Sequence, residues 1–199
     1  PITTHTAAQP KRPELIERLR KILAQGQQAY WVCTLIEPSE EIEALSAEEA
    51  FDLLRRELPE FRVALLHGRM KGDEKVEVMR AFKAGEYQLL VATTVVEVGV
   101  DVPNATQMFI ENAERLGLAQ LHQLRGRVGR GSKASRCFLL FKPGVSQAGQ
   151  YRLNALRQSQ DGFYLAEQDL KLRGPGDILG TRQSGEQSFK IADLSEHAH

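Results

Sequence analysis

Apolar residues along the chain alternate between short continuous runs and stretches of helical spacing. In residues 14–25 they recur every three or four positions, which predicts a helix that Pro13 opens and Gly26 ends. The same patterns predict strands at 28–36, 62–66, 87–92, 106–110 and 136–141, an acidic loop at 37–46, and helices at 47–58, 73–83 and 118–127. Unbroken apolar strands that alternate with helices indicate a parallel sheet covered on both faces. The sequence therefore predicts an α/β domain ending near Phe141.

The pattern changes after Pro143-Gly144 to helices without strands. Two helices are predicted, at about 146–158 and 162–171, followed by a glycine-rich stretch at 173–180 and a polar tail. We therefore divide the chain into a core domain, residues 1–143, and a helical hairpin with a loop, residues 144–199.

The composition is that of a water-soluble globular protein, and 199 residues suffice for one sizeable core. No apolar run approaches the roughly 20 residues of a membrane span, and the first residues lack the features of a signal peptide. We expect a cytoplasmic protein without membrane contact. Cys33 and Cys137 lie inside apolar runs, so we interpret both as small core residues.

Charge is segregated along the chain although the net charge is zero. Residues 37–60 hold nine acidic side chains against Arg55 and Arg56, whereas residues 115–160 hold nine Arg or Lys and no acid. A basic segment of this length favours an anionic partner such as phosphate. A solvated face balanced by acids elsewhere in the fold is equally compatible with the composition.

Three polar segments attract attention because they follow predicted strands or end a helix, and ligands of open parallel sheets collect at the carboxyl ends of strands. His67-Gly68-Arg69-Met70 follows the strand at 62–66, and residues 93–103 follow the strand at 87–92. The helix before the last strand ends in a Gly/Arg cluster, residues 123–130.

The Gly/Arg cluster has the chemistry of a phosphate site. Arg127 and Arg130 are three residues apart, which on a helix places them on one surface. Gly126 and Gly129 remove side chains that would block a phosphate. Guanidinium groups bind phosphate oxygens bidentately and keep their charge, as the transition state of γ-phosphate transfer requires. The alternative is a cluster that grips a nucleic-acid backbone without chemistry.

These segments resemble the motifs of superfamily 2 helicases. Residues 123–130 resemble motif VI, residues 92–103 resemble motif V, and residues 67–70 look like the motif IV region. In such helicases two RecA-like lobes clamp ATP between them. The resemblance implies a RecA-like fold, and it implies that this chain is the second lobe, partnered by the first lobe of the same polypeptide.

Longer strings, at 89–105, 114–131 and 169–185, resemble the RecG family of bacterial DNA translocases. This resemblance implies an ATP-dependent DNA helicase that remodels stalled forks and branched recombination intermediates, acting as a monomer at the nucleoid. The string at 169–185 is similar to the translocation motif shared with the transcription-repair coupling factor Mfd. Residues 181–185 favour RecG over an Mfd-like lobe; a non-catalytic nucleic-acid binding module is the third alternative.

The resemblance also implies roles for individual residues. Arg127 and Arg130 would be arginine fingers for the γ-phosphate, and Gln123 would position the nucleotide or its attacking water. Asp101, with Gly99, would contact the nucleotide, unless Asp101 is only a turn residue before a proline.

Further residues would contact DNA or couple the hairpin to the lobe. Thr93 and Thr94 would meet a DNA phosphate, with the role of plain strand formers left open. In the hairpin, Glu167 and Gln168 stand where one Gln is expected, so either could take its role. The remaining assignments are Arg69 for the DNA backbone and His122, Arg157 and Arg173 for coupling, with solvated helix surface as the alternative for the coupling residues.

The chain carries only half of an ATP site by sequence. Phosphoryl transfer needs a phosphate-cradling loop, and no Gly-x-x-x-x-Gly-Lys-Ser/Thr occurs. Residues 73–76 look like a DExH box but open a predicted helix, where acids favour the N-terminus. No Cys or His spacing indicates a metal site. We therefore expect ATP and Mg²⁺ to be held mainly by the first lobe, and the chain alone to lack ATPase activity.

Overall fold

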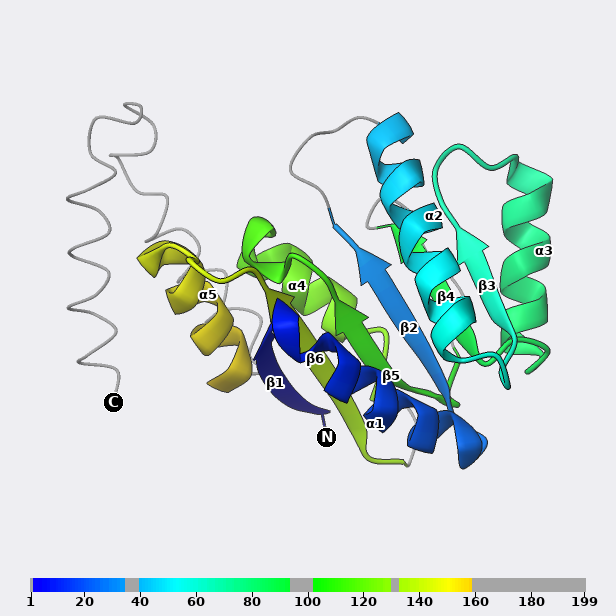
Figure 1. Ribbon diagram of the computed structural model, residues 1–199, viewed down its shortest axis with the longest axis horizontal. Coiled ribbons are helices and arrows are strands. Elements are labelled where there is room, and N and C mark those ends of the chain that lie inside the picture. The colour runs from blue at the N-terminus through cyan, green and yellow to red at the C-terminus, as the bar shows by residue number, and fades with distance from the viewer. Residues whose placement is uncertain (1, 35–39, 94–101, 130–132, 159–199) are drawn as a thin grey trace.

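The computed structural model describes residues 2–34, 40–93, 102–129 and 133–158, with the backbone alone described for 40–44 (Figure 1). The strands are β1 Ile2–Ala8, β2 Gln28–Cys33, β3 Val63–Leu66, β4 Leu89–Thr93, β5 Ala105–Ile110 and β6 Ser135–Phe141. The helices are α1 Arg12–Ala24, α2 Glu40–Glu57, α3 Gly72–Lys83, α4 Leu118–Arg125 and α5 Gln147–Gln158, with the short 3₁₀ turns η1 Gln9–Lys11 and η2 Ala113–Arg115.

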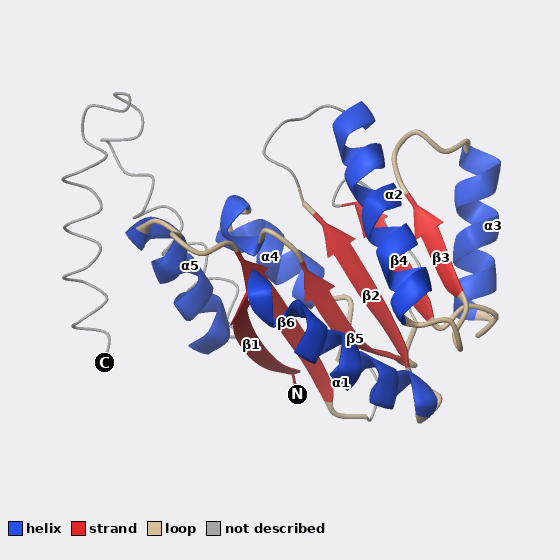
Figure 2. Cartoon of the chain, in the orientation of Figure 1, coloured by secondary structure: helices blue, strands red, loops and turns tan. Residues whose placement is uncertain are grey.

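The described strands form one parallel sheet in the order β1-β6-β5-β2-β4-β3 (Figure 2). β1 and β3 are therefore the two edge strands. Helices α1 and α2 cover one face, and α3, α4 and α5 cover the other. This architecture confirms the predicted α/β fold with a parallel sheet covered on both faces.

Burial on both faces explains why the strands read as unbroken apolar runs. Successive side chains of a strand point to opposite faces, and in β2 Trp31 faces α1 while Tyr30 and Val32 face α3. Two hydrophobic clusters result. The α1-side cluster includes Leu15, Leu19, Leu54, Leu58, Trp31, Phe109 and Phe138. The α4-side cluster includes Phe82, Leu90, Val102, Met108, Leu118, Leu121, Val128, Cys137, Leu153 and Leu156.

Two predicted boundaries were wrong and one strand was not predicted. Helix α2 begins at Glu40, inside the segment predicted as a loop, because acids at a helix N-terminus are favourable. Helix α4 ends at Arg125, two residues before the predicted end. Strand β1 has the polar sequence Ile-Thr-Thr-His-Thr-Ala-Ala, which shows no apolar pattern. It exists because its backbone pairs with β6 along all seven residues.

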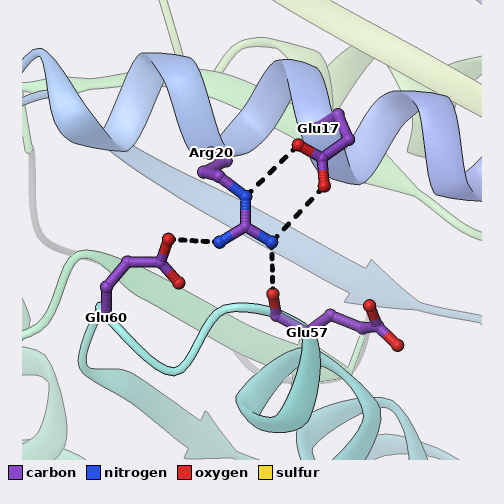
Figure 3. Close-up of polar contacts among 4 residues, drawn as sticks. All are labelled: Glu17, Arg20, Glu57 and Glu60. Carbon is purple, nitrogen blue, oxygen red and sulfur yellow. Dashed lines mark hydrogen bonds and ion pairs between the residues drawn. The ribbon is translucent and has the colours of Figure 1, made fainter.

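Arg20 of α1 contacts the carboxyl end of α2, so it connects the two helices that cover this face of the sheet (Figure 3). Its guanidinium donates to the Glu57 carbonyl at 2.5 Å, to Glu60, and to Glu17 at 3.3 Å. The Glu60 hydrogen bond, followed by that of Glu17, raises the pKa of Arg20, and the same bond lowers the pKa of Glu60. These groups are exposed, so the ion pairs add little to stability.

Helix α5 confirms the first helix predicted after residue 143, and it packs on the lobe. Leu153 and Leu156 are buried in the α4-side cluster beside Val128. The second predicted helix, at 162–171, lies outside the described residues. The division at residue 143 stays a prediction.

The two cysteines are core residues, as predicted. Cys33 lies in the α1-side cluster and Cys137 in the α4-side cluster, and both thiols are free. Burial raises the pKa of both thiols, that of Cys137 to about 12, so they stay neutral and unreactive. Within the described ranges, no helix has the length and apolarity to cross a membrane.

Candidate functional site

The motif IV region forms a tight turn after edge strand β3. The Met70 N–H donates to the His67 carbonyl at 3.2 Å, and the Arg69 N–H donates to His67 Nδ1 at 3.2 Å. Lys75 Nζ donates to the Gly68 carbonyl at 3.2 Å, which ties the turn to α3. His67 is buried and shapes the turn, whereas the Arg69 side chain is exposed.

The motif V region begins at the carboxyl end of β4, and most of it lies outside the described residues. Thr93 is 3% exposed, and its hydroxyl has no hydrogen-bond partner among the described residues. Burial of the side chain suits a strand former, and the DNA contact predicted for Thr93 stays a prediction. Residues 94–101, which include the predicted site residues Thr94, Gly99 and Asp101, are outside the described ranges.

The end of motif V and the helix of motif VI meet on one face of the sheet. Val102 is buried in the α4-side cluster together with Leu118 and Leu121 of α4. Gln123, on the same helix, is exposed. The end of motif V and the helix that leads into motif VI therefore contribute side chains to the same cluster, on the sheet face that carries α3, α4 and α5. The Arg69 turn follows β3, at an edge of the sheet.

The Gly/Arg cluster leaves the helix after Arg125 and continues as a turn, so it does not form the helical surface that its spacing predicts. Helix α4 ends with a hydrogen bond from the Gly126 N–H to the His122 carbonyl at 3.0 Å. The next two N–H groups donate to carbonyls three residues earlier, as in a 3₁₀ turn. Gly129 has a φ of +82°. A left-handed residue breaks helical periodicity, so the i, i+3 argument for Arg127 and Arg130 does not hold. Arg127 is half-buried after the helix end, and Arg130 lies outside the described residues.

The backbone conformation and the packing of Gly129 both favour glycine at this position. A Cβ at this position would lie 2.3 Å from Ile2 Cγ1, in the first residue of β1. A Cβ at Gly126, with ordinary helical φ, would meet only carbonyl oxygens at 3.4 Å and beyond. The turn therefore packs against the amino end of β1, whereas the Arg69 turn and Thr93 lie at carboxyl ends of strands. The turn that ends α4 thus lies at the opposite end of the strands from the other two segments.

Arg125, which the sequence reasoning missed, is a buried and hydrogen-bonded arginine of the cluster. It is 2% exposed and donates to the Leu156 carbonyl at 2.5 Å and to Thr4 Oγ1 at 3.3 Å. Its Nη2 lies 3.0 Å from His122 Nδ1, which acts as the acceptor because Arg has no lone pair to offer. Burial lowers the pKa of Arg125. One side chain thus connects α4 to α5 and β1, and the signal in the sequence was only its place inside motif VI.

A second set of residues that sequence reasoning missed ties β2 to β5 at their carboxyl ends. The Thr34 hydroxyl is buried and lies 2.5 Å from the Glu111 carbonyl and 3.0 Å from the Asn112 carbonyl. Asn112 adopts a left-handed φ of 52°, and Arg12 at the start of α1 pairs with Glu111. These contacts stabilise the central strands beside the motif V segment.

Comparison with known protein families decides the class of this lobe. The model of the helicase conserved C-terminal domain matches residues 14–132. The chain belongs to the helicase conserved C-terminal domain family. A second model, the C-terminal part of domain 3 of the ATP-dependent DNA helicase RecG, matches residues 159–198 of this helicase lobe.

Curated relatives of the helicase lobe carry the name ATP-dependent DNA helicase RecG. The protein of Escherichia coli K12 is 58% identical over 195 residues, and that of Bacillus subtilis is 50% identical over 177 residues. These matches cover 98% and 88% of this chain. The chain spans 28% of the length of the first relative and 26% of the second.

Solved structures agree in fold. A structure of RecG bound to a three-way DNA junction matches with a TM-score of 0.75 and 40% identity, over 97% of this chain and 25% of that one. Domain 2 of the DEAD-box helicase Mss116p, bound to an RNA duplex, matches with a TM-score of 0.57 and 16% identity, over 79% of this chain and 59% of that one. The second likeness shows the RecA-like fold alone.

Together the matches support a bacterial RecG C-terminal helicase lobe, as the motifs predicted. They do not favour the Mfd-like lobe or the non-catalytic binding module. The roles of the individual site residues stay predictions.

Proposed function

We propose that this chain is the second motor lobe of an ATP-dependent double-stranded DNA translocase that remodels stalled replication forks and branched recombination intermediates. The observation that carries the proposal is that the end of motif V and the helix leading into motif VI bury side chains in one hydrophobic cluster, in a chain with RecG-like sequence throughout. The whole protein would act as a monomer at the bacterial nucleoid, with its first lobe as the partner of this one.

The proposed chemistry of this lobe is stabilisation of charge on a nucleotide that the first lobe binds. Arg127 and Arg130 would reach the γ-phosphate, Gln123 would position the attacking water, and Gly99 with Asp101 would contact the nucleotide. The half-buried Arg127 next to the end of α4 fits this role, because a held guanidinium needs little reorganisation. Mg²⁺, which we assign to the first lobe and the nucleotide, would neutralise phosphate charge.

We further propose that the buried contact of Arg125 transmits movement of the motif VI turn to α5. Arg125 leaves the same helix end as Arg127, and its hydrogen bond to the Leu156 carbonyl joins that end to α5. His122 takes part through Nδ1. Movement would then continue into the hairpin and its residues Arg157, Glu167, Gln168 and Arg173, and so into duplex DNA, with Arg69, Thr93 and Thr94 as further proposed DNA contacts.

The test uses a two-lobe protein, in which this chain follows a RecA-like first lobe with a phosphate-binding loop. Arg127→Ala and Arg130→Ala should each lower DNA-stimulated ATP turnover by about 10³-fold, the effect of losing an arginine finger. Arg56→Ala, on the exposed surface of α2, is the matched control and should leave turnover unchanged. Turnover that survives the two substitutions while DNA binding weakens would contradict the finger assignment.

A further inference from the structure

Three arginines from three elements surround His5 on edge strand β1, and we name Arg18, Arg136 and Arg157 the β1-edge arginine cluster. The His5 ring stacks on Phe138 of β6 with centroids 5.1 Å apart. Arg18 of α1 lies over the same Phe138 ring, 5.7 Å from its centroid. Arg136 lies two residues before Phe138, so it projects from the same face of β6.

The positive charge of this cluster is felt at His5. The pKa of His5 is lowered by burial first, and then by the charges of Arg136, Arg18 and Arg157. Arg157 belongs to the last turn of α5, which packs beside β1. The charges of the three arginines, from α1, β6 and α5, therefore all act on the same side chain.

The elements that carry the cluster offer it no neutralising carboxylate. β1, β6 and α5 contain no acidic residue. Helix α1 contains Glu14 and Glu17, which pair with Lys11 and Arg20. Across the described part of the chain, no ion pair is found for any arginine of the cluster, whereas Arg12 has one and Arg20 and Arg80 have two each. Like charges gathered without a counter-charge create a potential that attracts an anionic ligand.

The surface fits a polyanion that is recognised by charge. Arg18 and Arg157 are exposed and Arg136 is half-buried, so all three can present their guanidinium groups to a ligand. An acidic peptide would also need apolar anchors. Among the described residues the exposed large apolar side chains are Leu45 and Val76, on α2 and α3, at the other end of the sheet.

We propose that the β1-edge arginine cluster is a second contact for the phosphate backbone of duplex DNA. It lies on the edge of the sheet opposite to the β3 turn that presents Arg69. Guanidinium groups bind phosphate oxygens without reading sequence, so the contact would hold and orient a duplex regardless of its sequence. The inference deepens the proposed function and rests on it.

The decisive experiment measures duplex binding by the two-lobe protein as a function of salt. Each phosphate contact contributes about 0.9 to the slope of log affinity against log salt. The double variant Arg18→Gln/Arg136→Gln should therefore bind DNA more weakly and with a slope smaller by about two. Arg157 is left unchanged because we also assign it a coupling role.

Two matched control variants test whether the change in slope depends on where the lost charges lie and on charge itself. Arg56→Gln removes an exposed charge on α2, away from the cluster, and should leave the slope unchanged. Arg18→Lys/Arg136→Lys keeps both charges and should retain the wild-type slope. A slope that stays the same in the double Gln variant, or that falls equally in Arg56→Gln, overturns the proposal.

The test also distinguishes this inference from the proposed function. The double Gln variant should keep the wild-type rate of ATP hydrolysis without DNA and need more DNA for half-maximal stimulation. If the Arg127 and Arg130 substitutions leave turnover intact while the double variant still loses salt slope, the motor assignment fails and the DNA contact stands. Loss of poly-glutamate binding with duplex binding intact would assign the surface to an acidic protein instead.

A local readout comes from the His5 ring. Bound phosphates would offset the arginine charges, so duplex DNA should raise the pKa of His5 in an NMR titration. A His5 pKa that does not respond to saturating duplex would contradict the proposed position of the DNA.

Discussion

Arginine occurs in two contrasting environments near β1. Arg125 is buried, whereas the β1-edge arginine cluster is largely exposed. Arg125 is 2% exposed and is held by three neutral acceptors from α4, α5 and β1. Arg18 and Arg157 are exposed, and the cluster has no carboxylate partner among the described residues. Burial with hydrogen bonds turns one positive charge into a structural brace, whereas exposure leaves the others available to an anion. The acid-free segment 115–160 is therefore not one uniform binding surface.

The largest effect is expected when the buried arginine is replaced. Arg125→Met keeps most of the volume but removes the donor to the buried Leu156 carbonyl and to Thr4 Oγ1. Buried groups without partners cost about 1–3 kcal/mol each, so the free energy of unfolding should fall by about 3 kcal/mol. Urea denaturation of the chain measures the change.

Arg18→Met is the control from the exposed side of the comparison. It should change the free energy of unfolding by less than about 0.5 kcal/mol, as surface substitutions do. Equal losses for the two variants would show that Arg125 does not brace the helices, and the coupling proposal would lose its physical basis.

A smaller effect is expected at the glycines of the motif VI turn, which adjoins Arg125. Gly129→Ala forces a side chain into a left-handed conformation and onto Ile2, which should cost about 2 kcal/mol in stability. Gly126→Ala meets neither problem and should leave stability nearly unchanged or slightly raised. Thermal unfolding compares the pair.

The same two variants separate packing from phosphate access. If both glycines serve to admit a phosphate, Gly126→Ala should damage ATP turnover in the two-lobe protein without loss of stability. The packing seen at Gly129 predicts that turnover survives Gly126→Ala.

The smallest effect is expected from the titration of His5 within the arginine cluster. Its pKa in the folded protein lies below the ordinary value of 6.5, so the unfolded chain binds the proton more readily. Stability should therefore fall as the pH drops below that value, and a His5→Gln variant should lose less over the same range. Urea unfolding at about pH 7.5 and about pH 5 checks the sign. An equal loss in both proteins would mean that the cluster does not act on His5.

Much of the fold follows from local patterns in the sequence. Runs such as Leu89–Thr93 are apolar at every position because both faces of the sheet are covered, and their burial was predictable. Strand β1 was not predictable, because Thr and His residues carry no apolar pattern and the strand depends on pairing with β6, more than a hundred residues away. The early start of α2 was missed because acidic residues suit both a loop and a helix N-terminus.

The candidate site was predictable in its motifs and not in its geometry. The residues 123–130 pointed to phosphate chemistry, but the spacing of Arg127 and Arg130 suggested a helical surface that Gly129 interrupts. The burial of Thr93 at the end of β4 was known only from the folded structure. Arg125 looked like one more basic residue of an acid-free segment.

The sequence by itself determined the family, the parallel α/β class and the residue types that can meet phosphate, because these depend on short strings and local periodicity. The tertiary structure decided which arginines brace the fold and which face outward. That distinction depends on contacts between β1, α4, α5 and β6, which are distant in sequence. Whether a charge is buried depends on what packs around it, and that information exists only once the chain is folded.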